Sequence, residues 1–324
     1  MRDVAVIYLF RFAEGESPVS RFLESYRKHP AGIDHDFYVV FKGFPDQVTL
    51  AAGCALFANV SFIPIELDDS GYDIGSYLNA AKIVSNSHLI FLNTFSQIRG
   101  KDWLRHFDCT LRIPNVGVVG ATGSWQANTS GYEAVIANLL RSEWRRQSAR
   151  ILPQGWVERS RLDRADELNI HRRGHKLTVK RLVLAPFDYA QRFYEYGRFP
   201  NPHIRTNAFM IERKQFLSLK FPAFVSKQDV YRFESGRRSL TRQILARGQK
   251  PVVVGRNGMM YEISEWRSSS TFWTGEQDNL IIADNRTVDY AEGEQTLRAK
   301  LQNYAWIHPW LWNTKRNHSS DRSG

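Results

Sequence analysis

Short apolar segments alternate with longer amphipathic segments over the first 120 residues of the chain. Runs such as VAVIYLF and HLIFL have the length and composition of buried strands, and the stretches between them repeat apolar residues at helical spacing. The predicted strands cover Val4 to Phe12, Phe37 to Phe41, Ser61 to Leu67, His88 to Leu92 and Val116 to Gly120. The predicted helices cover Val19 to His29, Gln47 to Ala58, Gly75 to Val84 and Lys101 to Arg112. This alternation predicts an α/β fold with a Rossmann-type, mainly parallel sheet flanked by helices.

The pattern is less regular beyond Gly120. A helix is expected over Tyr132 to Arg150, and a basic, poorly periodic region up to Pro202 is interpreted as an insertion (about 141–202). A second α/β portion follows, with a strand at Asn207 to Glu212, a helix at Leu240 to Arg247 and a strand at Pro251 to Val254. We therefore expect an α/β domain over 1–262, a C-terminal helical extension over 263–312 and a disordered tail over 313–324.

The net positive charge of the chain indicates which classes of partner it can bind. The 324 residues contain 44 Lys and Arg against 33 Asp and Glu, a formal net charge of +11. Twelve basic and five acidic residues lie between Arg141 and Arg181. Such a segment attracts nucleic acid, an anionic membrane surface or a diphosphate substrate, although a solvated helix face has the same composition. Cys54 and Cys109 offer neither a disulfide framework nor a zinc-type spacing.

Polar residues follow two of the predicted strands. Asp68, Asp69 and Asp73 occupy the turn after the third strand, where carboxylates can accept hydrogen bonds from ribose hydroxyls or a base N–H. A turn with an Asp helix cap is the alternative reading. Asn93 and Ser96 follow the strand that ends at Leu92, either as ligand contacts or as a polar turn.

A third group lies in the second α/β portion. Arg205 and Asn207 precede or begin a strand, and Asp229 and Glu234 follow about twenty residues later. A carboxylate in a partly dry pocket can accept the proton of an attacking hydroxyl, while Arg205 can offset the charge of a departing diphosphate. A salt-bridged loop is the alternative, because three arginines flank Glu234.

These pieces in this order resemble the GT-A glycosyltransferases, especially the inverting family-two type and bacterial rhamnan-synthesis-like polysaccharide proteins, over roughly residues 1 to 260. The resemblance rests on Arg205-Thr206-Asn207-Ala208-Phe209 and on Phe233-Glu234-Ser235-Gly236 with the Leu240 to Gly248 segment before the last strand. It implies a GT-A-like fold whose first half binds a nucleotide-sugar. The donor-binding residues are then Asp69, Asp73, Asn93 and Ser96, together with Arg205 and Asn207 of the second portion. The catalytic Asp of the family falls at Ser235, so the base is inferred to be the neighbouring Glu234, with Asp229 as the competitor.

The metal-binding Asp-x-Asp motif of that superfamily falls at Asn93 to Ser96, where this chain has no carboxylate. The resemblance thus implies either that Arg or Lys neutralises the diphosphate, or that Mg²⁺ or Mn²⁺ is held through Asp68, Asp69 or Asp73. We expect weak or absent metal dependence and assign no metal ligand.

Together these features predict an enzyme that transfers sugar from a nucleotide-sugar to a hydroxyl of a cell-surface glycan or of a polyprenyl-diphosphate-linked acceptor, as in bacterial capsule or lipopolysaccharide synthesis. The basic segment and the tryptophans at 306, 310 and 312 suggest a cytoplasmic protein that contacts the inner face of the membrane, although these tryptophans can equally pack in a core. Two rivals remain: a catalytically inactive GT-A-like binding or scaffold protein, and a nucleic-acid-binding protein. The latter is not expected, since no helix-turn-helix, zinc-finger or RNP-like signature is present.

Overall fold

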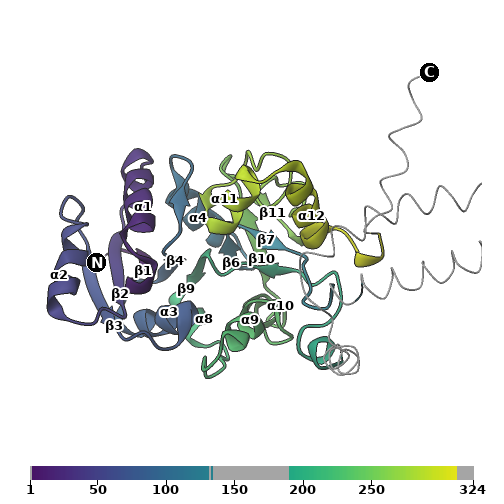
Figure 1. Cartoon of the computed structure of the whole chain (residues 1–324), viewed down its shortest axis with the longest axis horizontal. Helices are drawn as coiled ribbons and strands as arrows, with labels where there is room; N and C mark the ends of the chain where they lie inside the picture. Colours follow the sequence, from purple (N-terminus) through teal and green to yellow (C-terminus); the bar gives the residue numbers. More distant parts are fainter. Residues whose placement is uncertain (1, 131–132, 134–189, 312–324) are drawn as a thin grey trace, which may run out of the picture. The chain divides into compact units, whose positions relative to one another are not determined.

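A computed structural model describes residues 2–130, 133 and 190–311 of the chain (Figure 1). These residues belong to two compact units, one formed by 1–126 with 200–306 and the other by 127–199 with 307–324. In the second unit, residues 190–196 are helical and the ring of Phe199 meets that of His308 edge-on. The predictions for the helix at 132–150, for the basic segment at 141–181, for Trp312 and for the tail at 313–324 lie outside the described residues.

The first unit is built on one mixed sheet of eight strands, in the order β11-β10-β6-β9-β4-β1-β2-β3 (Figure 1). The strands are β1 (Val4–Arg11), β2 (Asp36–Lys42), β3 (Ile63–Leu67), β4 (His88–Leu92), β6 (Val116–Gly120), β9 (Ala208–Glu212), β10 (Lys250–Val254) and β11 (Met260–Tyr261). Neighbouring strands are parallel except where β9 meets β4 and β6, and where β11 meets β10. The α/β fold with a mainly parallel sheet is therefore confirmed.

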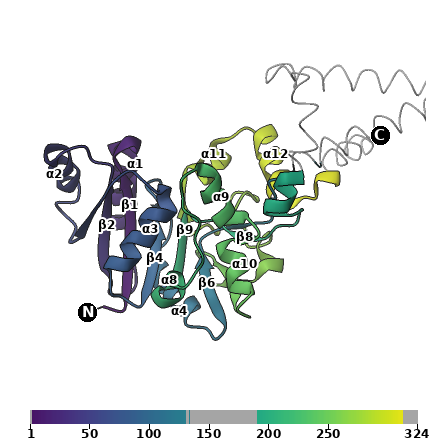
Figure 2. The ribbon, with the colours of Figure 1, turned by 90° about the horizontal axis from the view of Figure 1, so that it is seen from below.

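Helices cover both faces of this sheet (Figure 2). One face carries α1 (Glu16–Lys28), α2 (Gln47–Ala55) and α4 (Trp103–Leu111), and the other carries α3 (Tyr72–Ile83), α8 (Arg213–Leu217), α9 (Lys227–Ser235) and α10 (Leu240–Leu245). The C-terminal part is helical as predicted, with α11 (Asn285–Glu292) and α12 (Gln295–Trp306). No helix among residues 2–130 and 190–311 combines the length and the apolar character needed to cross a bilayer.

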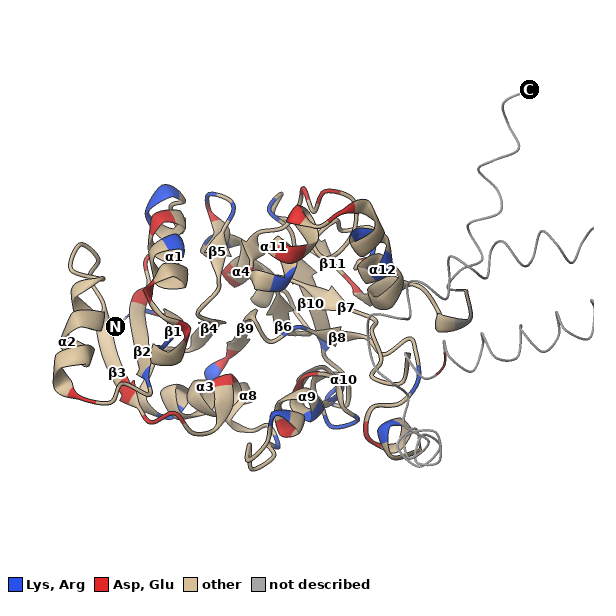
Figure 3. Ribbon diagram, viewed as in Figure 1, with Lys and Arg blue, Asp and Glu red and all other residues tan. Residues whose placement is uncertain are grey.

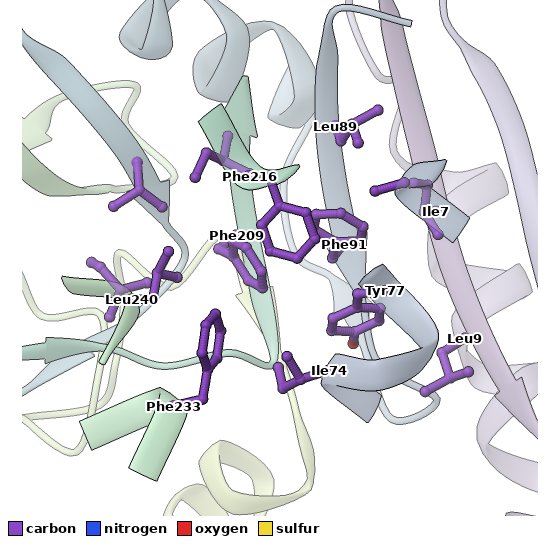
Figure 4. Packing of buried hydrophobic residues seen from close by; sticks show 14 of the residues in the cluster. Ile7, Leu9, Ile74, Tyr77, Leu89, Phe91, Phe209, Phe216, Phe233 and Leu240 are labelled. Atoms are coloured by element: carbon purple, nitrogen blue, oxygen red, sulfur yellow. The ribbon is translucent and has the colours of Figure 1, made fainter. Parts of the chain in front are cut away.

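The continuous apolar sequence of β1 follows from its central position. Ile7 and Leu9 point to the α3 side, and Val6 and Tyr8 point to the α1 side, so that both faces of the strand are buried. On the α3 side the ring of Tyr77 stacks on that of Phe91 and meets that of Phe209 edge-on (Figure 4). These aromatic residues belong to the buried core on the α3 side of the sheet.

The strand β9 occupies a place that the linear pattern does not reveal. It runs antiparallel between β4 and β6, with Leu92 opposite Ala208 and Gly120 opposite Phe209. Because of this reversal, the amino end of β9 lies at the same edge as the carboxyl ends of β1, β4 and β6. The residues that precede β9 are thereby brought to the edge where ligands bind in open α/β sheets.

Small pairings complete the unit. Two-stranded ladders join β5 (Gln97–Ile98) to β12 (Ile282–Ala283) and β7 (Gly123–Ser124) to β8 (His203–Ile204). The sequence pattern predicted none of these short strands, and it assigned no helix to the segment that forms α9. The ladder between β5 and β12 attaches the C-terminal part to the loop after β4, so that residues up to 306 belong to the same compact unit as the sheet.

Candidate functional site

The sheet changes its direction of winding between β1 and β4. From β1 the chain moves outward through β2 to β3, and α3 then returns it to β4 on the opposite side of β1. A crevice forms at such a switch point, outside the carboxyl ends of the strands. The connection from β3 to α3 at this edge carries acidic residues (Figure 3).

An arginine at the end of β1 is tied to one of the predicted aspartates. Arg11 donates from Nε and from Nη2 to the two carboxylate oxygens of Asp69, each at 2.7 Å, and from Nη1 to Glu14 at 3.3 Å. The Arg11 guanidinium lowers the pKa of Asp69, which stays ionised. The fork geometry fixes Asp69 at the rim of the crevice.

A lysine at the end of β2 holds the acidic turn in place. Lys42 is buried, and its Nζ donates to the carbonyl oxygens of Ser70 and Tyr72 at 2.6 and 2.8 Å and to Oγ of Ser76 at 2.9 Å. Three acceptors match the three N–H bonds of an ammonium group. Burial lowers the pKa of Lys42. The turn it supports contains Gly71 and Tyr72 at φ values of 73° and 54°, of which the second is costly for a residue with a side chain.

A cavity opens beside this turn. It has a volume of about 690 Å³ and lies between the first turn of α3 and the segment 222–225. Tyr72, 39% exposed, and Phe224 give it two aromatic walls, and both residues have positive φ values. Asp69 and Asp73 supply carboxylates and Arg11 a cation. The cavity thus combines aromatic surface with hydrogen-bond acceptors.

Asp73 is half-buried in the first turn of α3. Burial raises its pKa; Lys42 opposes this change, whereas Glu14 and Glu234 add to it. The helices α3 and α9 pack against each other, so the negative charge of Glu234 acts on Asp73 from the neighbouring helix.

Two asparagines meet at the carboxyl edge. The main-chain N–H of Asn93 donates to the carbonyl of Asn207 at 3.0 Å, and Oδ1 of Asn93 accepts from Ser96 Oγ at 3.0 Å. Oδ1 of Asn207 accepts from Thr122 at 3.2 Å, but its buried Nδ2 has no partner among the described residues. The predicted residues of the two strand ends are therefore brought together, and one amide donor remains available there.

The two candidate bases of α9 have different surroundings. Asp229 accepts from the N–H and hydroxyl of Ser226, both at 2.9 Å, and from Arg232 at 2.9 Å, so that it closes a capping box. Hydrogen bonds from Ser226 lower the pKa of Asp229. Glu234 accepts from the N–H of Thr206 at 3.4 Å at the carboxyl edge. Of the two carboxylates, Glu234 is the one that lies near the other candidate residues.

Arg205 does not line the cavity, and its guanidinium is paired with a carboxylate. Its Nη2 donates to Oδ2 of Asp284 at 2.6 Å, and its guanidinium lies over the ring of Phe272 at 4.4 Å. The pair is buried, with 8% and 1% of the two side chains exposed. Arg205, predicted to contact a diphosphate, is therefore already paired with a carboxylate, and the cations that line the cavity are Arg11 and Lys42.

Sequence reasoning missed Arg11, Lys42 and Asp284. The available signal for the first two was a basic residue ending each of two strands that are otherwise almost entirely apolar. Asp284 had the pattern of a helix cap, which it also fulfils by accepting from the N–H of Thr287 at 2.9 Å.

The residues present do not fit a resident Mg²⁺ or Mn²⁺. These cations prefer several anionic oxygens, yet both oxygens of Asp69 are bonded to Arg11, and the loop after β4 presents amide and hydroxyl groups. Within residues 2–130 and 190–311, no cluster of three or more His, Cys, Asp or Glu side chains is placed to hold a metal ion.

No family model and no curated protein sequence matches this chain. Among solved structures, the chain is similar to a mannosyltransferase, PcManGT from Pyrobaculum calidifontis, in complex with GDP-Man and Mn²⁺. The identity is 15%, with 36% of this chain and 34% of that one covered and a TM-score of 0.31. It is also similar to S. aureus TarS 1-349 in complex with UDP-GlcNAc, with 17% identity, 37% and 34% coverage and a TM-score of 0.30. The chain thus spans about a third of the length of these structures.

Proposed function

We propose that this protein is a glycosyltransferase that uses a nucleotide-sugar donor. The observation that carries the proposal is a cavity of about 690 Å³ that Asp73 of α3 lines at the switch point of the sheet, with the carboxylate of Glu234 from α9 bonded to the Thr206 N–H at the same carboxyl edge. Ligand cavities of cofactor size have volumes of about 300–1,000 Å³. A site of this kind can bind a nucleotide on one side and a sugar acceptor on the other.

The nucleoside half of the donor fits the cavity by its chemistry. Tyr72 and Phe224 provide aromatic surface for a base, and Asp73 provides an acceptor for ribose hydroxyls. The uncharged ribose also suits the cavity, because its two cationic and two aspartate side chains carry nearly equal and opposite charge. The polar half of the donor then extends toward Asn93 and Asn207.

The diphosphate is assigned to Arg11. A guanidinium carries five N–H bonds, and the hydrogen bonds of Arg11 with Asp69 and Glu14 use three of them. The remaining N–H bonds can donate to phosphate oxygens and stabilise the negative charge that develops on the leaving group. Asp69 and Glu14 hold the guanidinium in a fixed orientation for this purpose.

Glu234 is assigned as the general base. It accepts the proton of the acceptor hydroxyl while the hydroxyl oxygen bonds to the anomeric carbon and the nucleoside diphosphate departs, which inverts the anomeric centre. Asp229 is less suited to this role, since its oxygens serve the capping box and its pKa is lowered. The acceptor is proposed to be a hydroxyl of a cell-surface glycan or of a lipid-linked glycan at a membrane surface.

Calorimetric titration with UDP, GDP, TDP and ADP, followed by incubation with the corresponding sugar nucleotides, tests the proposal. We expect one nucleotide to bind selectively and its sugar derivative to release the nucleoside diphosphate, because slow transfer to water needs no knowledge of the acceptor. A protein that binds none of the nucleotides contradicts the proposal.

A second candidate is a nucleotide-sugar-binding protein without transferase activity. The observation that favours it is the pairing of Arg205 with Asp284, which leaves the region around Glu234 with one cation fewer than the sequence suggested. Selective nucleotide binding without any release of nucleoside diphosphate, even when bacterial glycans are added as acceptors, would favour this candidate.

A further inference from the structure

The segment that leads into β9 connects two parts of the protein. Arg205 reaches the C-terminal part through Asp284, the residue that caps α11, at 2.6 Å. The next residue, Thr206, donates its main-chain N–H to Glu234 at 3.4 Å. Asp284 therefore binds the residue directly before Thr206, whose N–H contacts Glu234, the residue assigned as the base.

Other hydrogen bonds restrain the same segment. The N–H of Arg205 donates to the carbonyl of Thr122 at 3.1 Å, and the N–H of Ile204 donates to Oγ1 of Thr241 in α10 at 2.8 Å. Asn201 donates from Nδ2 to the carbonyl of Ser235 at 2.6 Å, directly after Glu234. The ion pair is the one restraint in this set that comes from the C-terminal part of the unit.

A buried ion pair is an expensive way to obtain stability. Well-packed apolar residues of similar volume are often as stabilising or more so, because they avoid the desolvation of two charges. An ion pair does fix direction, since the guanidinium must present an N–H to one carboxylate oxygen. Because Arg205 directly precedes Thr206, the ion pair can fix the position of the Thr206 N–H that contacts Glu234.

We propose that Asp284 is a positioning residue, which orients Arg205 and thereby holds the Thr206 N–H against the carboxylate of Glu234. The role of Glu234 as a base rests on the proposed transferase function, but the positioning itself does not. On this view residues 263–306 complete the catalytic edge.

Two variants separate position from stability. Asp284→Asn removes the charge and keeps a side chain that caps α11 equally well. The double variant Arg205→Met with Asp284→Asn also removes the uncompensated cation, and Met retains contact with the ring of Phe272. Glu276→Gln is the matched control, because it breaks the exposed pair with Arg298 in the same part of the chain.

The first readout is the amide resonance of Thr206 in protein labelled with ¹⁵N-threonine, followed through a pH titration. Charged and titratable groups around Glu234 are Asp73 on α3, His203 in β8, Arg205 and the flanking Arg232, Arg237 and Arg238; burial lowers the pKa of His203. The titration step that belongs to Glu234 is the one that Glu234→Gln abolishes. We expect this step in the wild type and in Glu276→Gln, and less than half its amplitude in the two Asp284 variants.

The second readout is donor turnover. We expect kcat to fall by about 10-fold or more in both Asp284 variants, with the KM for the donor within about 2-fold, because the nucleotide pocket is untouched. A purely structural role would lower the melting temperature without this split between kcat and KM.

The outcomes distinguish the two proposals. An unchanged Thr206 titration in a folded Asp284 variant overturns the positioning role, as does its absence from the wild type. Failure of both variants to fold also overturns it, since the pair would then be a requirement of the fold. If Thr206 behaves as expected but the wild type transfers no sugar, the positioning role stands and the transferase proposal alone fails.

Discussion

Asn93 and Asn207 lie directly opposite each other at the carboxyl edge of the sheet, where the N–H of Asn93 donates to the carbonyl of Asn207 at 3.0 Å. This bond continues the ladder that pairs Leu92 with Ala208. Two polar segments more than a hundred residues apart in the chain therefore form one surface. The antiparallel direction of β9 makes this possible, because a parallel strand would place Asn207 at the opposite edge.

Replacement of Glu234 by Gln tests the base directly. We expect turnover to fall by about 100-fold, since an amide cannot accept the proton of the acceptor hydroxyl. Nucleotide affinity should stay within about 2-fold, because the cavity lining excludes Glu234. Release of nucleoside diphosphate in the presence of acceptor and calorimetric titration measure the two quantities.

Asp229→Asn is the matched control on the same helix. It weakens the capping box and should lower the free energy of unfolding with little change in turnover. The assignment is reversed if Asp229→Asn, and not Glu234→Gln, abolishes transfer.

Asp73→Asn should separate stability from binding. Burial raises the pKa of Asp73, so the folded protein retains a proton that the unfolded chain has lost at the same pH. Its contribution therefore makes the free energy of unfolding fall as pH rises above the ordinary Asp value of 3.8. At neutral pH the Asn variant should be at least as stable as the wild type and bind nucleotide about 10-fold more weakly.

Melting temperatures at pH 4 and pH 7, combined with calorimetry, check both parts of this prediction. The stabilising effect of Asp73→Asn should be smaller at pH 4. A variant that is destabilised at pH 7 and retains full nucleotide affinity would show that Asp73 serves the fold and not the ligand.

Lys42→Met should loosen the turn that carries the aspartates. The substitution leaves two carbonyls and a hydroxyl without their donor, which should cost about 2–4 kcal/mol of unfolding free energy. Nucleotide affinity should also fall, because Tyr72 and Asp73 lose their support. Chemical denaturation and calorimetry give the two values.

Lys82→Met on the exposed side of α3 is the control for Lys42→Met and should change neither quantity. Equal effects of the two substitutions would mean that the loss of one positive charge, and not the anchoring of the turn, is responsible.

Nucleotide binding should persist without divalent cations. Arg11 and the neighbouring polar groups are assigned to the donor, and the described residues offer no carboxylate cluster for a metal. We therefore expect the dissociation constant to change less than about 3-fold between EDTA and millimolar Mg²⁺ or Mn²⁺, and Arg11→Met to weaken binding about 10-fold or more in both conditions. Binding that requires Mn²⁺ would contradict this assignment of the charges.

The sequence predicted the central strands well because their signal is local. Continuous apolar runs place β1, β4 and β6 within one residue of their observed ends. The helix α9 was missed, since charged residues dominate it, although Ser226 and Asp229 have the spacing of a capping box. That spacing was the signal that could have identified both the helix and the structural role of Asp229.

The candidate site was only partly predictable for a different reason. Asp73, Asn93 and Asn207 are polar residues at or near the ends of elements that the sequence predicted, and Glu234, from a helix that it missed, lies at the same edge. The partners of Lys42 are mainly main-chain carbonyls, which no side-chain pattern encodes. Arg205 and Asp284 are 79 residues apart, and nothing in either local sequence indicates the other.

The insertion of β9 between β4 and β6 has a consequence for biosynthesis. A nascent chain that has emerged only as far as residue 200 contains both neighbouring strands, but each has an open edge where β9 will pair. Such edges promote aggregation, and contacts between distant parts of a chain form slowly. Because the residues just before β9 form part of the proposed site, that site is assembled only when the sheet closes. The ribosome-bound protein should therefore need protection by chaperones until residue 212 has left the exit tunnel.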